Sequence, residues 1–126
     1  MSIEINKEHK ELVKELIKNP LDIVDSWDYM DADLIHSAMG ISGEAGELLD
    51  AIKKTVMYRK PLDIDNVIEE LGDLEFYMEN LRSSLDITRE ETLQANIDKL
   101  RKRYSIGYSD QAAQDRADKV EVEWAE

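Results

Sequence analysis

The chain has 126 residues, of which 16 are basic and 29 acidic, giving a formal net charge of -13. This length predicts one domain with a core of its own, and the negative charge argues against nucleic acid polymers and anionic membranes as partners. The absence of cysteine excludes disulfides and thiolate metal sites. Because the start, MSIEINKEHK, lacks an apolar signal core and no run of about 18 apolar residues follows, we expect a cytoplasmic protein without a membrane span.

Apolar side chains recur at helical spacing over most of the chain, which predicts an all-α fold. Asn19-Pro20 and Pro61 mark breaks, because proline cannot continue a helix. Thr88 and Glu91 form a capping-box pattern that opens the fourth helix, and Gly107 is expected to close it. The four predicted helices cover about residues 4–18, 34–57, 64–85 and 88–107.

Two segments have weaker patterns. Residues 21–33 connect the first and second helices and have room for a short helix. The polar, acidic tail over 109–126 has one weak helical pattern near 110–119, and Trp124 lies close to its end. Because no linker or low-complexity stretch divides the chain, we expect a single domain over 1–126 with a four-helix-bundle type of architecture.

Two acidic pairs stand on neighbouring predicted helices. Glu44-Ala-Gly-Glu47-Leu is echoed by Glu70-Leu-Gly-Asp73-Leu, and acids three residues apart share a helix face. Each pair precedes two positions of the apolar stripe by one residue, which is about 100° of rotation. If the two helices pack antiparallel, the four carboxylates meet at the mouth of their groove. Ordinary solvated acids explain either pair alone, but the repeat of the glycine and of the offset favours a shared site.

Four carboxylates at one place repel one another and raise one another's pKa, and a cation relieves that repulsion. Oxygen ligands without cysteine suit Mg²⁺, with Mn²⁺ as a second possibility. The stretch Asp63-Ile-Asp65-Asn66 starts like a calcium loop but lacks the later ligands and the glycine. The sequence therefore predicts a magnesium site on the second and third helices.

Glycines accompany both acidic pairs, although each costs a helix about 1 kcal/mol relative to alanine. We interpret them as allowing the phosphates of a ligand, or another helix, to approach the backbone closely. Tight helix packing without a ligand is the alternative. The glycines concerned are Gly40, Gly43, Gly46 and Gly72.

A basic stripe lies on the fourth predicted helix. Asn96, Lys99 and Arg103 each precede an apolar position by one residue, and two cations with an amide suit a polyphosphate. A solvated helix face is the alternative, because this helix is charged nearly all round. Together with a metal site, the stripe becomes a candidate phosphate clamp.

Further residues have both a binding and a structural interpretation. Lys53 and Lys54 can reach phosphate or pair with Asp50, and pairing is the favoured interpretation. Trp27 can stack on a base or belong to the core, and Tyr77 can line the site or pack. His36 is interpreted as structural, because a lone histidine is more often structural than a metal ligand.

The segment GEAGELLDAIKK followed by EELGDLEFYM resembles the MazG-like, all-α nucleoside triphosphate pyrophosphohydrolases, whose pattern is ExxE, a spacer and ExxD. The later ANIDKLRKRY is similar to the family's asparagine, lysine and arginine-tyrosine segment. The resemblance covers about residues 34–108. It implies Mg²⁺-dependent cleavage of a (deoxy)nucleoside triphosphate into monophosphate and pyrophosphate, and leaves open whether the role is housecleaning of aberrant nucleotides.

The resemblance also implies roles for particular residues. Glu44, Glu47, Glu70 and Asp73 are the expected metal ligands, and Glu47 is the candidate proton acceptor. A homodimer or homotetramer is implied as well, in which helices complete each other's bundle. The candidate substrate-binding residues are Asn96, Lys99, Arg103, Tyr104, Lys53 and Trp27.

Two other classes of function compete with this hypothesis. A non-enzymatic helical interaction protein with a metal-stabilised bundle explains the amphipathic helices but not the repeated acid-glycine-acid pattern. A di-iron carboxylate bundle ranks last, because such bundles use Glu-x-x-His and this chain has none.

Overall fold

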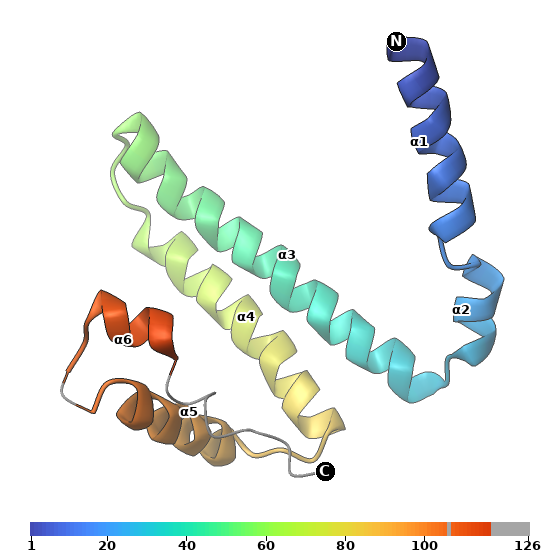
Figure 1. Cartoon of the computed structure of the whole chain (residues 1–126). Coiled ribbons are helices and arrows are strands. Elements are labelled where there is room, and N and C mark those ends of the chain that lie inside the picture. Colours follow the sequence, from blue (N-terminus) through green and yellow to red (C-terminus); the bar gives the residue numbers. More distant parts are fainter. Residues whose placement is uncertain (106, 117–126) are drawn as a thin grey trace.

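The computed structural model describes residues 1–105 and 107–116, and the described part of the chain is built from α-helices (Figure 1). The predicted all-α fold is thereby confirmed. Outside the helices, an isolated bridge pairs Ser105 with Gly107. The helices are α1 (Ser2–Leu16), α2 (Pro20–Ser26), α3 (Tyr29–Tyr58), α4 (Ile64–Ser84), α5 (Arg89–Arg103) and α6 (Asp110–Asp115).

The break expected at Asn19-Pro20 is the start of α2, so the connection does hold a short helix. The Asn19 side chain accepts a hydrogen bond of 2.8 Å from the backbone N–H of Leu21, and Pro20 occupies the first helical turn. Proline is tolerated there because that N–H has no partner within the helix. Trp27 then ends α2 in an extended conformation.

Helix α3 begins at Tyr29, so the predicted start at residue 34 is wrong by five residues. Asp28 and Asp31 form a capping box: Asp31 N–H donates to Asp28 at 2.9 Å, and Asp28 N–H donates to Asp31 at 3.0 Å. The aspartates that were assigned to a connection are therefore the N-terminal cap of the longest helix. Arg59, with a positive φ of 56°, ends that helix.

Helices α4 and α5 begin at capping residues. Asp63 accepts a bond of 3.0 Å from Asn66 N–H, which gives this residue a structural role at the start of α4. Thr88 and Glu91 form the predicted capping box of α5. The expected closure of α5 at Gly107 is wrong, because the helix ends at Arg103 and Gly107, with φ 94°, lies in the following turn. The weak helix of the tail is α6, and Trp124 lies outside the described residues.

The extensive packing in the described part of the chain lies between α3 and α4, which form an antiparallel hairpin, with a smaller contact between α5 and α6. Helices α1 and α2 extend away from this hairpin (Figure 1). Ala51, at 7% exposure, is the one apolar residue of the described part of the chain that counts as buried. No described helix combines the length and the apolar character that crossing a bilayer requires.

The two helices of the hairpin meet in a regular register of successive layers. Asn80 donates a hydrogen bond of 2.7 Å to Ser37, the most buried residue of this region at 1% exposure. One turn further along α3, Gly40 lies against Tyr77. The next turn brings Glu44 to the carboxylates of α4. The register therefore places a polar layer, a glycine–tyrosine layer and an acidic layer in succession.

Arg82 links the end of α4 to the start of α5. Its side chain is buried although charged, and it pairs with Glu79 at 3.0 Å and Glu75 at 3.5 Å. Arg89 at the start of α5 approaches the same Glu75 at 3.7 Å. These pairs compensate the buried guanidinium and hold the first turn of α5 beside α4.

Candidate metal centre

Three of the four predicted carboxylates converge on the hairpin. Glu44 comes from α3, and Glu70 and Asp73 come from α4. One carboxylate oxygen of each lies within 4.8 Å of the others. Glu44 and Glu70 are half-buried and Asp73 is exposed. The predicted antiparallel packing therefore produces a group of oxygen donors open to solvent on one side.

The electrostatics of this group favour a cation. Partial burial raises the pKa of Glu70, a hydrogen bond shared with Glu44 raises it further, and the charges of Glu44, Asp73 and Glu47 add to the shift. Two carboxyl groups share a hydrogen bond only when one of them holds a proton. The ion pairs of the hairpin engage other acids, namely Asp50, Glu75 and Glu79. A divalent cation would replace the proton and compensate the charge.

Glu47 takes a different position from its three partners. It is exposed on α3 and is not a member of the group of three, although its charge contributes to the raised pKa of Glu70. It therefore lies close enough to feel the site electrostatically. This arrangement distinguishes Glu47 from Glu44, which the sequence pattern treats as equivalent.

The family model of the MazG nucleotide pyrophosphohydrolase domain matches residues 36–106, which is more than half of the chain. The chain belongs to this family. The match includes both acidic pairs and the basic stripe of α5. One similar protein is the Gene 37 protein of Mycobacterium phage L5, 32% identical over 78 residues that cover 59% of this chain and 68% of the phage protein. No solved structure matches the chain.

The basic stripe of this MazG domain lies on α5, which is not one of the two helices that carry the carboxylates. Beyond its first turn, α5 packs on α6, whereas α3 packs on α4. Asn96 and Lys99 are exposed, and the half-buried Arg103 lies 5.9 Å from the centre of the Tyr104 ring. The packing within one chain thus gives no direct support to a phosphate clamp beside the carboxylates.

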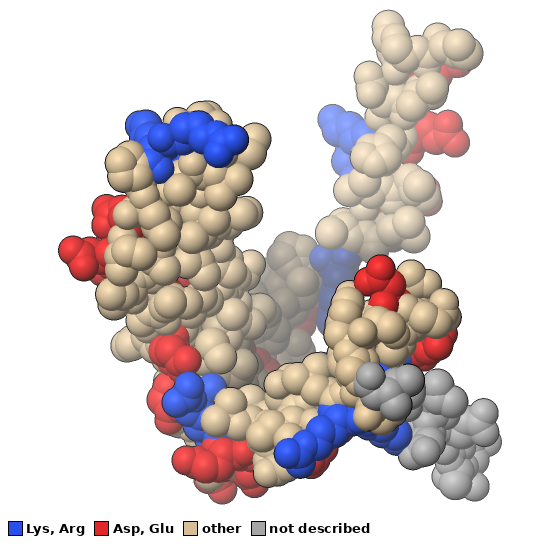
Figure 2. Space-filling model, turned by 90° about the vertical axis from the view of Figure 1, so that its left-hand side faces the viewer, with Lys and Arg blue, Asp and Glu red and all other residues tan. Residues whose placement is uncertain are grey.

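The remaining candidates also lie apart from the three carboxylates in the chain. Lys53 stands 6.0 Å above the ring of Tyr58, and it is Lys54 that pairs with Asp50, at 3.3 Å. Trp27 is partly exposed at the junction of α2 and α3. Figure 2 shows basic side chains gathered over the end of the hairpin where α3 leads into α4, and acidic side chains along its length.

The glycines of the MazG domain fall into two kinds. A side chain on Gly40 would collide with Tyr77, whereas a Cβ on Gly43, Gly46 or Gly72 would meet nothing within 4 Å. Close helix packing within the chain therefore explains Gly40 alone. The other three leave open backbone beside the acids.

Sequence reasoning missed the polar layer next to the site. Asn80 donates to Asp33 at 3.1 Å as well as to Ser37, and Ser84 donates to the other oxygen of Asp33. These hydrogen bonds, from Ser84 first and Asn80 second, lower the pKa of Asp33, and the nearby His36 lowers it slightly further. The available signal was the spacing of four between the polar residues on each helix.

Proposed function

We propose that this MazG domain hydrolyses a nucleoside triphosphate between its α and β phosphates, releasing a monophosphate and pyrophosphate, and that it requires Mg²⁺. The observation that carries the proposal is the convergence of Glu44, Glu70 and Asp73 from two helices within a matched MazG domain. A family match without these acids would indicate only a fold. The acids without the family match would indicate only a cation site.

The donors fit the proposed cation. Carboxylate oxygens are the protein ligands that Mg²⁺ accepts, usually one or two of them with substrate phosphates completing the shell, and Mn²⁺ accepts the same donors. The exposed side of Asp73 leaves room for a triphosphate to approach. When bound, the cation supplies charge neutralisation and a more acidic water.

The chain's own residues have separate proposed roles around that group. Glu44, Glu70 and Asp73 hold the cation. Glu47 lies near them but outside the group, so its carboxylate is the candidate acceptor for the proton of the attacking water. Asn96, Lys99 and Arg103 are proposed to bind the pyrophosphate portion, where positive charge stabilises the leaving group. Gly46 leaves backbone open to phosphate.

We also propose that the protein self-associates as a homodimer or homotetramer. The chain exposes 10931 Å², whereas a compact monomer of 14.5 kDa exposes about 6,900 Å². The eleven residues outside the described ranges account for at most about 1,800 Å² of this excess. The remaining excess, about 2,200 Å², lies within the roughly 1,000–2,500 Å² that each partner buries in an obligate homodimer.

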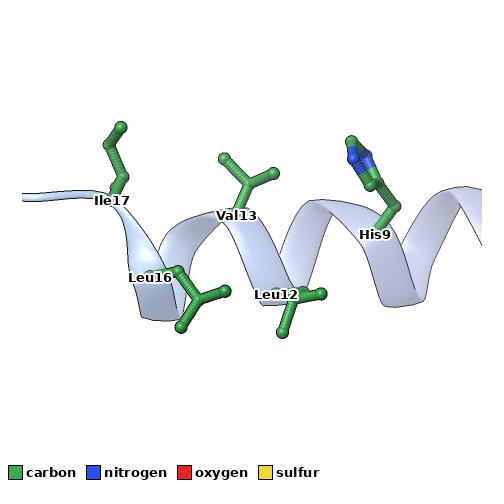
Figure 3. A pocket seen from close by; sticks show the side chains of 5 residues that line it. All are labelled: His9, Leu12, Val13, Leu16 and Ile17. Carbon is green, nitrogen blue, oxygen red and sulfur yellow. The ribbon is translucent and has the colours of Figure 1, made fainter. Parts of the chain in front are cut away.

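Helix α1 provides a clear surface for that association. Figure 3 shows Leu12, Val13, Leu16 and Ile17 as an apolar surface along α1 with His9 at its end. All five side chains are exposed, and Leu16 reaches 75%. A second copy can cover this surface, and association also offers a way to bring α5 of one chain to the carboxylates of another.

The decisive experiment measures product release from a panel of canonical and modified nucleoside triphosphates, with Mg²⁺ and with EDTA. We expect pyrophosphate and monophosphate to appear in equal amounts with Mg²⁺ only, and the panel then ranks the bases. Release of single phosphate would instead indicate a different hydrolase. No turnover of any nucleotide would contradict the proposal and favour a non-enzymatic helical interaction protein.

A further inference from the structure

Helices α3 and α4 approach each other closely at Gly40. An ideal Cβ built on this glycine lies within 2.5 Å of three carbons of the Tyr77 ring, Cγ, Cδ1 and Cε1. Ordinary carbon–carbon contacts lie at about 3.5–4.0 Å, so an added methyl group demands a displacement of about 1 Å. Because Cγ is the root of the ring, turning the ring about its own axis does not relieve the clash.

The Tyr77 ring is held from other sides as well. The ring of His36 stands edge-on to it with centroids 5.9 Å apart, and that of Phe76 does the same at 5.1 Å. Tyr77 is itself half-buried. An intruding methyl group would therefore push the helices apart or force the ring into another rotamer.

This contact is one helical turn from the proposed metal ligands on both helices. Gly40 precedes Glu44 by four residues on α3, and Tyr77 follows Asp73 by four residues on α4. On its other side lies the hydrogen bond between Asn80 and Ser37. The glycine–tyrosine layer thus sits between a fixed polar layer and the carboxylates.

We infer that the contact of Gly40 with Tyr77 is a spacer that sets the separation of α3 and α4 at the carboxylate layer. Gly40 and Tyr77 are then positioning residues for cation binding by Glu44, Glu70 and Asp73. The inference rests on the proposed metal site. Its physical basis is that Mg²⁺ demands near-ideal ligand geometry, whereas the three carboxylates come from two helices, so the separation of the helices affects the distances between the ligands.

The glycines of α3 provide the internal control. Gly43 lies on the same helix, next to Glu44, yet a Cβ there meets nothing within 4 Å. Alanine is a better helix former than glycine, so both substitutions improve helix propensity equally. A loss of cation affinity confined to Gly40→Ala is therefore attributable to the contact with Tyr77.

The test is calorimetric titration of the full chain with Mn²⁺ alone, without nucleotide. We expect Gly40→Ala to weaken Mn²⁺ binding about tenfold or more, since a ligand misplaced by about 1 Å is costly, and Gly43→Ala to stay within about twofold of the unsubstituted chain. Circular dichroism verifies that each variant retains its helices. Unchanged affinity in Gly40→Ala would overturn the inference.

A double-mutant cycle identifies the partner. Tyr77→Ala removes the ring, so adding Gly40→Ala to that variant should change Mn²⁺ affinity less than about twofold, because the clash is absent. Tyr77→Phe keeps the ring and should bind Mn²⁺ as the unsubstituted chain does. Equal losses from Gly40→Ala in both backgrounds would overturn the spacer.

The same proteins separate this inference from the proposed function. Urea unfolding of the four members of the cycle measures the contact itself and needs no metal and no nucleotide. If the free energies of unfolding are non-additive but Gly40→Ala binds Mn²⁺ normally, the contact contributes to packing and does not position the ligands. That result overturns the inference and leaves the proposed catalysis untouched. If the four proteins bind Mn²⁺ with the expected affinities but hydrolyse no nucleotide, the result supports the spacer and contradicts the enzymatic proposal. An unsubstituted chain that binds no Mn²⁺ overturns both.

Discussion

The α3–α4 hairpin and helix α1 both carry apolar side chains at helical spacing, but they bury them differently. In the hairpin, Ile41, Leu48 and Leu74 are half-buried by the facing helix. On α1, every residue is exposed, Leu16 included, and so is Ile17 directly after it. The comparison teaches that periodicity specifies which face of a helix is apolar, whereas the chain connections decide whether the same molecule covers it.

The difference extends to function. The hairpin assembles three carboxylates from its own residues. The sequence also carries stripes on α1 and α5, but among the described residues neither helix contributes to the group of three carboxylates. We therefore expect changes in the hairpin to abolish the chemistry, and changes in α1 and α5 to act through association and substrate binding.

The largest effect is expected at the centre of the hairpin. Glu70→Ala removes a carboxylate of the group of three. The pKa of this carboxyl is raised by the charges of the other three motif acids, Glu44, Asp73 and Glu47. Pyrophosphate release should fall at least about 100-fold, a loss that even indirect damage to a metal site can cause, while circular dichroism stays unchanged. Glu69→Ala, at the exposed neighbouring acid, is the matched control. Equal turnover in Glu70→Ala would remove this residue from the site.

The next effect tests whether α1 needs a second copy. Leu16→Lys places a charge in the apolar surface of Figure 3, where burial of an unpaired charge is costly. Light scattering should show a smaller assembly than the unsubstituted protein forms at the same concentration. Glu11→Lys, which introduces the same side chain on the opposite face of α1, should leave the assembly intact. Identical assemblies for both variants would contradict a role for this surface.

A smaller effect is expected on α5. Lys99→Ala removes a cation proposed to bind pyrophosphate, so KM should rise about tenfold, as for one hydrogen bond to a charged group, and kcat should change less. Arg101→Ala, on another face of the same helix, is the control. Unchanged KM for Lys99→Ala would exclude that residue from the substrate site.

The smallest effect concerns the polar layer of the hairpin. Hydrogen bonds from Ser84 and Asn80 hold the pKa of Asp33 below its ordinary value of 3.8. Because the folded-state pKa is depressed, the stabilisation is present above 3.8 and is lost as the pH falls through the folded-state value. Asp33→Asn should therefore lower urea stability more at about pH 6 than below pH 3.8, relative to Asp25→Asn on α2. A cost independent of pH would contradict the ionic contribution of Asp33.

Much of the site could be read from spacing within helices. The repeat of acid, glycine and acid correctly placed Glu44, Glu70 and Asp73 on facing helices, because residues three apart share a face. It did not distinguish Glu47, which spacing treats as the equal of Glu44. The structure brings Glu44 into the group of three and leaves Glu47 outside it, because the two acids differ in how they face α4.

The ends of helices were less predictable than their centres. The start of α3 was placed too late because Asp28 and Asp31 were assigned to a connection, although together they cap the helix. The predicted end of α5 at Gly107 is too late, because the positive φ of this glycine belongs to a turn that follows the helix. Aspartate occurs both in helix caps and in loops, and so does glycine. Only the backbone geometry distinguishes a cap from a loop.

The sequence by itself determined the all-α class, the two acidic pairs and the MazG family, because these depend on periodicity and on motifs within single helices. The tertiary structure decided which acids converge, which glycine is needed for packing, and which apolar stripe stays uncovered. The physical reason is that distances between elements depend on side-chain volumes meeting across an interface. No pattern within one helix specifies those volumes for its partner.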